Sequence, residues 1–300
     1  MSIFYRAVMV IGILITFNAG SAFAVPFTPT IDEFWIVKGS AAAGPSEIFR
    51  DSFNNGIPPP SGPDGATTYS LYGSAGMTSE SGGRLTMTPS LGGTTLVTNT
   101  YADLTTNALR LVATSPTNAS FLGVASSFEI HGLFDMANLP TVSGQSFGIS
   151  ATDRAVGLGN LGNDIYSLFI GVSGNTGDVV VGLRHNDNTT NLSTVIDAIS
   201  IQSLLSNAVQ IELMLSKALD ASQLTASYIL YNGSNGILGS GSVGSNNVLS
   251  IYDGENYIRA AFQSTDRITV PEPSTLLLLG LGAAGLSFVR RRSTHFRISA

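Results

Sequence analysis

The stretch Gln210–Ser216, with the sequence QIELMLS, alternates apolar and polar side chains with a period of two residues. Ile211, Leu213 and Leu215 fall on one face of an extended chain, and Glu212 falls on the other. This alternation is typical of a strand that has one face in a hydrophobic core and the other in water. The stretch therefore predicts a half-buried β-strand.

The same alternation recurs along the chain, in short runs separated by Gly, Asn, Ser and Thr. Turn residues stand between these runs at Asn175-Thr176-Gly177, Asn232-Gly233 and Asn235-Gly236. Short strands between turns predict an all-β fold, here an antiparallel β-sandwich. The further predicted strands are Gly83–Thr88, Ala108–Ala113, Ser126–Gly132, Ser146–Ala151, Ile165–Val172, Asp178–Arg184, Thr225–Tyr231 and Tyr257–Phe262.

Three segments do not fit this pattern. Val195–Ala208 has imperfect helical spacing and predicts one or two turns of helix. Ile57–Gly65 is rich in proline and predicts an exposed loop. Trp35 lies in the apolar run Ile31–Val37, and we expect it to cap the core, with stacking on a sugar ring as the alternative.

The first 24 residues, 1–24, have the three parts of a secretory signal peptide. Arg6 supplies the positive start, Ala7–Phe17 is the apolar region, and Ala22 and Ala24 form a small-x-small cleavage site. We therefore expect export, with Val25 as the first residue of the mature protein.

The C-terminal region has a second tripartite pattern. Val270–Thr275 is followed by the apolar run Leu276–Val289 and then by three arginines, Arg290, Arg291 and Arg292. The apolar run has 14 residues, whereas a bilayer-spanning helix needs about 20. We predict a short hydrophobic transmembrane helix from about Ser274, because the preceding prolines cannot continue a helix, and the arginines hold the last residues in the cytoplasm. So short a span favours a removable signal, and a plain membrane anchor is the alternative.

This tail resembles the PEP-CTERM sorting signal of exported bacterial proteins. The motif Pro271, Glu272 and Pro273, the short hydrophobic segment and the basic cluster match in order over 270–292, followed by an unusually long cytoplasmic tail, 293–300. The resemblance implies that a transpeptidase-like membrane enzyme, exosortase, recognises and removes the tail. It also implies a protein that is anchored in the membrane transiently and then reaches the cell surface or the extracellular space.

Charge and cysteine content exclude several classes of function. Without the two terminal segments, nine basic and nineteen acidic side chains remain, a net charge of −10. An acidic surface of this kind is unfavourable for nucleic acid and for anionic lipid, because both require basic patches, so no nucleic-acid partner is expected. The chain has no cysteine, so its stability rests on the core, and cysteine-based zinc sites are excluded.

A second resemblance concerns the mature domain. Phe49-Arg50-Asp51-Ser52-Phe53-Asn54 followed by Gly82-Gly83-Arg84-Leu85 looks like the opening of concanavalin A-like lectin/glucanase (LamG-like) domains. The resemblance implies a jelly-roll sandwich over 49–269, preceded by an N-terminal segment, 25–48. Such sandwiches host many unrelated activities, so the fold alone assigns no function.

Two glycine motifs have no supporting context. Gly144–Gly148 is a literal G-x-S-x-G, but a loop precedes the serine and an alternating strand follows it, whereas a nucleophile elbow needs a strand and then a helix. Gly157–Gly162 and Gly280–Gly285 match G-x-G-x-x-G, but neither opens a helix in a βαβ unit.

Glu129–Phe134 is the stretch nearest to a glycosidase strand. Jelly-roll glucanases carry Glu-x-Asp-x-x-Glu, and here His131 replaces the aspartate and Phe134 the last glutamate. Alternation places Glu129 and His131 on one face, where an acid and a base could meet, although a solvated strand face is the commoner outcome.

Two oxygen-rich loops are candidates for a calcium site, with Asn163, Asp164 and Asp187 as ligands. Asn and Asp also favour turns through their own backbone hydrogen bonds, so we expect no cofactor, and Ca²⁺ remains the alternative.

Together these features predict an exported, exosortase-sorted protein of the cell envelope, extracellular matrix or biofilm. We expect a non-catalytic protein that binds glycan, with extracellular polysaccharide as a partner. The alternatives are a jelly-roll carbohydrate-active enzyme and a purely structural matrix protein.

Overall fold

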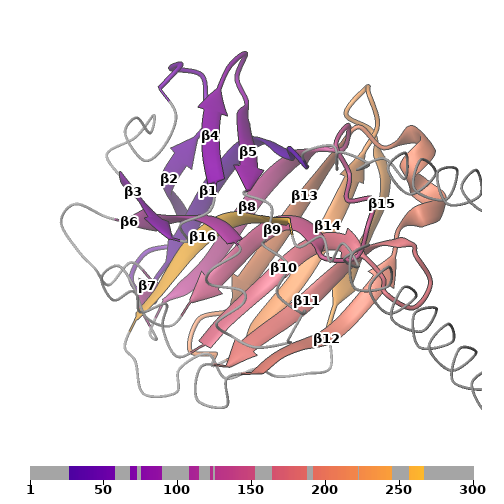
Figure 1. The fold of residues 1–300 in the computed structure, drawn as a ribbon. Helices are drawn as coiled ribbons and strands as arrows, with labels where there is room; N and C mark the ends of the chain where they lie inside the picture. The colour runs from indigo at the N-terminus through magenta and orange to yellow at the C-terminus, as the bar shows by residue number, and fades with distance from the viewer. Residues whose placement is uncertain are drawn as a thin grey trace, which may run out of the picture.

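The protein folds into two antiparallel β-sheets packed face to face (Figure 1). A computed structural model of the chain describes residues 27–57, 68–72, 76–89, 108–114, 122–123, 126–152, 164–187, 192–221, 223–244 and 257–266. In this part of the chain the only helix is the short 3₁₀ helix η1 (Gln202–Asn207). The all-β antiparallel architecture predicted from the alternating runs is therefore confirmed.

Sheet A has the strand order β15-β14-β13-β8-β1-β5-β4, and β2 also pairs with β1. Strand β1 pairs with β8 along most of its length on one side, and with β5 and β2 on the other. The strands of sheet A are β1 (Thr30–Gly39), β2 (Ser46–Asp51), β4 (Gly76–Glu80), β5 (Leu85–Pro89), β8 (Ser127–Asp135), β13 (Gln210–Lys217), β14 (Leu224–Tyr231) and β15 (Ile237–Val243).

Sheet B has the order β12-β11-β10-β9-β16-β6-β3, and β7 also pairs with β16. The last strand in sequence, β16, lies between β9 and β6, and is therefore internal to the sheet. The strands of sheet B are β3 (Thr68–Tyr72), β6 (Ala108–Thr114), β7 (Leu122–Gly123), β9 (Gln145–Thr152), β10 (Asp164–Val172), β11 (Val179–Asp187), β12 (Leu192–Ser200) and β16 (Tyr257–Asp266).

The hydrophobic core lies between the two sheets. Ile211, Leu213 and Leu215 of β13 are fully buried, as their alternation predicts. Aromatic rings from both sheets meet in the core: the ring centroids of Phe34 and Phe262 lie 5.1 Å apart. Burial of such side chains supplies the main stabilisation of a protein without disulfides.

The strand registers define two ends of the sandwich. Asp266, the last residue of β16, pairs with Gln145, the first residue of β9, and the loop before Gln145 comes from the end of β8. We call this the exit end, because β16 leaves the sandwich here. The β14–β15 turn and η1 also lie at this end, at the upper right of Figure 1. Residues 40–45, which follow β1, and residues 218–221, which follow β13, lie at the opposite end.

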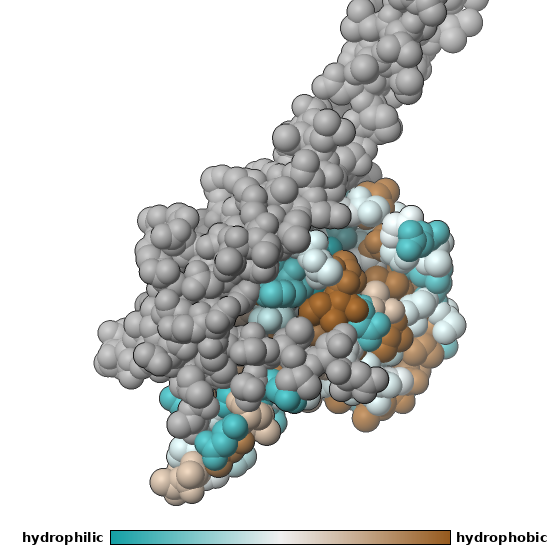
Figure 2. Space-filling view, turned by 90° about the horizontal axis from the view of Figure 1, so that it is seen from below, coloured by the Kyte–Doolittle hydropathy of each residue, from teal (hydrophilic) through white to brown (hydrophobic). Residues whose placement is uncertain are grey.

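The surface is poor in charge, and hydrophobic residues are scattered over it. Figure 2 shows hydrophobic residues exposed among hydrophilic ones on the visible face of the described part. The exposed large hydrophobic side chains of the described residues are Ile48, Ile57, Val142, Val195, Val209, Leu219 and Ile237.

Several predictions are confirmed. Each run predicted as a strand from alternation coincides with an observed strand, although three of the runs begin one or two residues too early, and the turns at Asn175-Thr176-Gly177 and Asn232–Gly236 connect neighbouring strands. The jelly-roll identity implied by the second resemblance stays a prediction.

One prediction of local structure is only partly right. Val195–Ala208 is not helical throughout, because β12 runs to Ser200 and pairs with β11 over its length. The β-branched residues Thr194, Val195 and Ile196 favour an extended strand, and a ladder partner is available. The predicted helical turns are confined to η1.

The predicted start of the sandwich at residue 49 differs from the structure. Strand β1, inside the supposed N-terminal segment 25–48, lies in the middle of sheet A, and its Phe34 and Ile36 are fully buried. The period of two is broken in β1 by register shifts near Asp32 and between Ile36 and Val37, which hide the strand from a search for alternation.

The predicted C-terminal helix over 276–289 lies outside the described residues, as do most residues of the loop predicted at 57–65. Among the described residues, the structure contains no helix with the length and apolar character needed to cross a membrane.

Candidate functional site

A row of side chains crosses the outer face of sheet A, the face turned away from the core. Arg50 of β2 pairs in register with Trp35 of β1, Trp35 pairs with His131 of β8, and His131 pairs with Met214 of β13. Side chains on one face of an antiparallel sheet contact their direct cross-strand neighbours. The register therefore brings together residues that are far apart in sequence.

The indole of Trp35 lies between two cationic or titratable groups. The imidazole of His131 stacks on it with ring centroids 4.6 Å apart and planes 9° apart. The guanidinium carbon of Arg50, on the neighbouring strand at the other side, lies 4.8 Å from the indole centroid. Trp35 is thus partly exposed on the outer face and does not cap the core as predicted. Because its two neighbours cover the ring, its faces are not open for stacking on a sugar.

His131 lies between two carboxylates. Its Nε2 is 3.1 Å from Glu129 Oε2, and its Nδ1 is 2.9 Å from Glu212 Oε1. The Tyr231 hydroxyl donates a hydrogen bond of 2.7 Å to Glu212 Oε2. The shared face predicted for Glu129 and His131 is therefore confirmed. Glu212 and Tyr231 were not predicted, because only the strand register brings them there.

The hydrogen bonds determine how these groups titrate. The hydrogen bond to His131, aided by that from Tyr231, lowers the pKa of Glu212 although burial opposes the shift. Burial and the hydrogen bond to Glu212 raise the pKa of Tyr231 to about 12. Glu212 is therefore held as a carboxylate and Tyr231 as a neutral hydrogen-bond donor at neutral pH.

A pocket of about 360 Å³ adjoins this row at the end of the sandwich opposite the exit end. It combines hydroxyl, amide and carboxylate groups with small apolar residues, and Glu129 belongs to both the pocket and the His131 cluster. The Ser216 and Thr225 hydroxyl oxygens in its wall lie 2.6 Å apart. Its lining residues are Val37, Gly39, Pro45, Ser127, Phe128, Glu129, Ser216, Lys217, Ala218, Ala221, Gln223 and Thr225.

Lys217 supplies a buried cation at the wall of this pocket. Its side chain is inside the protein, and Nζ donates hydrogen bonds to the carbonyl oxygens of Ser126 (2.6 Å) and Ala218 (3.1 Å). Burial lowers the pKa of Lys217. The lysine ties the end of β13 to the start of β8 and so fixes the shape of the pocket.

A second polar cluster lies at the exit end. Arg84, in the turn between β4 and β5, binds Asp32 through Nε at 2.9 Å and also binds Asp135. Asp32 accepts a further hydrogen bond from Gln210. Burial raises the pKa of Asp32 despite these partners. The cluster joins three strands of sheet A, and its guanidinium is shared by two carboxylates.

The serine of the G-x-S-x-G match is not in a nucleophile elbow. Ser146 lies inside β9, where it pairs with Thr265 of β16 and Gly171 of β10, and a strand rather than a helix follows it. Both G-x-G-x-x-G matches lie outside the described residues.

Two of the three candidate calcium ligands lie opposite each other on neighbouring strands. Asp164 at the start of β10 pairs in register with Asp187 at the end of β11, whereas Asn163 lies outside the described residues. Within the described ranges, no group of three or more His, Asp or Glu residues has the arrangement of a metal site. A calcium site here stays a prediction.

The residues of the two terminal signals are outside the described part of the chain. They are Ala22, Ala24, Pro271, Glu272, Pro273, Arg290, Arg291 and Arg292.

Comparison with known proteins informs one part of the chain. No curated protein shows significant similarity to it. Residues 269–292 match the family model described as the PEP-CTERM protein-sorting motif. The match covers the terminal stretch alone, so it identifies a sorting signal and leaves the β-sandwich unassigned. The motif indicates a protein that is exported, anchored transiently in the membrane, and processed by exosortase for delivery to the cell surface.

Proposed function

We propose that the protein is a non-catalytic component of the cell envelope or extracellular matrix, such as a biofilm matrix, that binds polysaccharide. The binding site is the pocket that adjoins the outer face of sheet A at the end opposite the exit end. The observation that carries the proposal is this pocket, on a protein whose sorting motif delivers it to the cell surface, where polysaccharide is found.

The chemistry of the pocket suits a short stretch of glycan. Its volume of about 360 Å³ is within the range of small-molecule sites, which run from roughly 300 to 1,000 Å³. Ser127, Ser216, Thr225 and Gln223 offer hydroxyl and amide groups for sugar hydroxyls. Val37 and Pro45 give apolar contact for the carbon face of a sugar ring.

Two features of the His131 cluster support a non-catalytic role. A glycosidase needs two carboxylates facing a sugar, one of them protonated as the general acid. Here the imidazole of His131 occupies the space between Glu129 and Glu212. The lowered pKa of Glu212 makes it a poor proton donor at neutral pH.

A glycan array probed with the exported protein, purified from its host, tests the binding. Ala221, in the pocket wall, is replaced by Trp to fill the pocket, and the exposed Ala198 of β12 is replaced by Trp as the matched control. We expect glycan binding by the wild type and by Ala198→Trp, and loss of binding by Ala221→Trp. Equal binding by both variants would place the glycan elsewhere.

The alternatives give different results in a second assay. If the protein is a carbohydrate-active enzyme, reducing sugar is released from a panel of β-glucans, and Glu129→Gln abolishes the release. If it is a purely structural matrix protein, it neither binds glycan nor releases sugar.

Export and sorting are tested separately by mass spectrometry of the mature protein. We expect a mature N-terminus at Val25 and a C-terminus near Pro271. An intact Leu276–Ala300 on the extracellular form would contradict processing by exosortase.

A further inference from the structure

We infer that the exit end of the sandwich is a membrane-facing surface that lies on the bilayer while the sorting tail is in place. The inference rests on the proposed anchoring by the tail, and it adds which surface of the folded domain the bilayer contacts.

The stretch of chain between the sandwich and the apolar segment is short. Strand β16 ends at Asp266, the sorting motif begins at residue 269, and the apolar run begins at Leu276. Nine residues, 267–275, separate Asp266 from Leu276, and the ten residue-to-residue steps span at most about 35 Å when fully extended. A folded domain of about 240 residues has a radius of gyration of roughly 18 Å, hence a diameter of about 45 Å. The tether is shorter than the domain, so the opposite end cannot turn to the bilayer.

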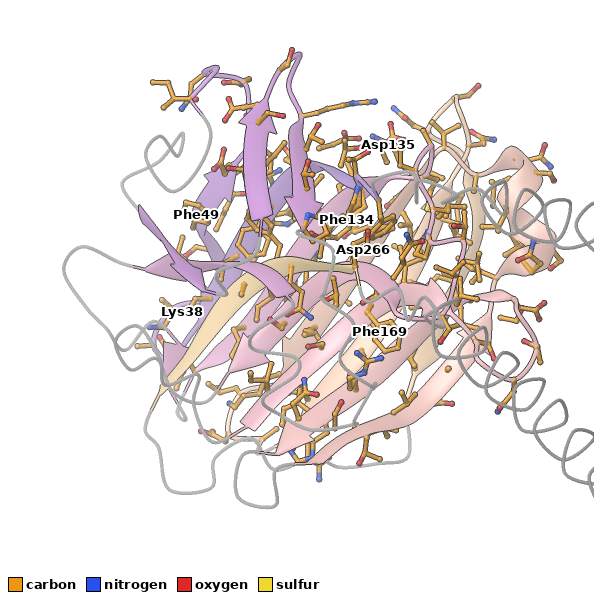
Figure 3. All side chains as sticks on the ribbon, in the orientation of Figure 1. Lys38, Phe49, Phe134, Asp135, Phe169 and Asp266 are labelled. Atoms are coloured by element: carbon orange, nitrogen blue, oxygen red, sulfur yellow. The ribbon has the colours of Figure 1, made fainter. Side chains whose placement is uncertain are left out.

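Strand β16, from which the tether leaves the sandwich, is held in the interior of sheet B. Asp266 and Phe262 are fully buried, and β16 is hydrogen-bonded in register to both β9 and β6. In Figure 3, Asp266 and Asp135 lie toward the same end of the molecule, and Lys38 lies far from them. An internal strand frays less readily than an edge strand, so the tether starts from a fixed point of the exit end.

The exit end exposes large apolar side chains. Val142, Val209 and Ile237 expose 40%, 43% and 66% of their surface, and all three lie in or beside its loops. Val209 and Ile237 flank the same residue, since Val209 N–H bonds to the Tyr231 carbonyl and Tyr231 pairs with Ile237. Exposed apolar side chains of this kind partition into the boundary between headgroups and acyl chains.

The loops at the exit end carry few charged side chains. Five loops at the exit end, 81–84, 136–144, 173–178, 201–209 and 232–236, contain two charged residues, Arg84 and Asp178. Arg84 is paired with the carboxylates of Asp32 and Asp135. Little charge therefore has to be desolvated when these loops meet the interface. The surface fits a bilayer better than a highly charged partner.

The absence of cysteine in the chain allows a direct test. Single cysteines are introduced at Val142, Val209 and Ile237 in the full chain, and labelled with a fluorophore. Ile48 and Leu219, with 41% and 37% exposure and positions away from the exit end, are the matched controls. The proteins are reconstituted in vesicles of the zwitterionic lipids phosphatidylethanolamine and phosphatidylcholine that contain spin-labelled lipid as a quencher.

We expect the lipid quencher to act about twofold more strongly on the exit-end labels than on the control labels, because shallow insertion brings them to the headgroup level. Flotation with the vesicles reports anchoring independently. Full chain that floats with the vesicles but shows equal quenching at all five positions would overturn this inference alone. Full chain that does not float with them would overturn both the anchoring by the tail and this inference.

Discussion

At the scale of single residues, Glu212 joins the groups of the outer face into one hydrogen-bonded unit. One of its oxygens contacts His131 and the other accepts from Tyr231, and its side chain is only 16% exposed. These contacts lower its pKa from the ordinary value of 4.5, so the folded state binds the proton more weakly than the unfolded state. The stability that results is present above the unfolded pKa and is lost as the pH falls through the folded pKa.

We therefore predict that Glu212→Gln lowers the free energy of unfolding by about 1–2 kcal/mol at pH 5 and by much less at pH 3. Urea denaturation of the wild type and the variant at both pH values measures the difference. Glu47→Gln is the control, because the side chain of Glu47 is 43% exposed and its ion pair with Arg50 is screened by water. A constant difference between Glu212→Gln and the wild type from pH 5 to pH 3 would contradict the assignment.

Sequence alone locates part of this site. A period of two places Glu129 and His131 on one face, and the structure confirms it. Trp35, Glu212 and Tyr231 join them through pairing between strands that are far apart in the chain, and the register of those pairs depends on the whole sheet. No local pattern encodes that register, so the site could not be assembled from sequence.

At the scale of the elements, Gly148 controls how closely β9 and β10 approach. A Cβ at this position would lie 2.1 Å from the Leu168 carbonyl oxygen and 2.8 Å from Phe169 Cα. Both are backbone atoms of the neighbouring strand and cannot rotate away. We predict that Gly148→Ala destabilises the protein by about 3 kcal/mol, measured by urea denaturation.

Gly174, in the turn between β10 and β11, provides the control for this prediction. A Cβ there would have Ser143 Oγ, at 3.8 Å, as its nearest neighbour. Gly174→Ala should therefore leave the stability unchanged or raise it slightly, because alanine restricts the unfolded chain. Similar losses in the two variants would show that strand spacing is not the cause.

Strand β1 gives a second prediction at this scale. We expect a chain beginning at Phe49 to show no cooperative unfolding transition, because it lacks the strand that joins β8 to β5 and β2. A chain beginning at Val25 should unfold cooperatively and is the control. Circular dichroism during thermal denaturation compares the two, and cooperative unfolding of the shorter chain would restore the boundary at residue 49.

The elements that sequence analysis found and missed differ in regularity. Strands such as β13 and β14 alternate cleanly, because one face packs in the core and the other meets water. Strands that were not predicted from the sequence have other patterns. The pairing of β1 with β2 has a register shift, which interrupts the alternation. Strand β15, with the sequence ILGSGSV, has too few apolar residues to show a period of two. Neighbouring strands order these segments through backbone hydrogen bonds, which depend little on side-chain identity.

At the scale of the whole molecule, the two proposals assign separate tasks to the two ends of the sandwich. The exit end leads into the sorting tail and exposes apolar side chains, whereas the pocket proposed for polysaccharide lies at the opposite end. With the exit end on the bilayer, the pocket would point away from the membrane. The order of the elements thus makes anchoring and ligand binding compatible in one domain.

The two sheets also share one core, and this gives a prediction about the whole domain. Trp35, the one tryptophan of the chain, lies on the outer face of sheet A, so its fluorescence reports on that sheet. Far-ultraviolet circular dichroism reports on the strands of both sheets. The rings of Phe34 and Phe53, on the side of the core formed by sheet A, contact the ring of Phe262 in sheet B. Unfolding of either sheet would therefore expose the core-facing side chains of the other sheet to water.

We therefore predict that fluorescence and circular dichroism give the same urea midpoint for the mature exported protein. The midpoint should also be unaffected by a thiol reductant, because the chain has no disulfide to lose. The control is Phe262→Ala, which removes the shared aromatic contact and should move both midpoints together by an amount equivalent to about 3–5 kcal/mol. A fluorescence midpoint clearly below that of circular dichroism would mean that sheet A unfolds before sheet B, and that the sandwich is not a single cooperative unit.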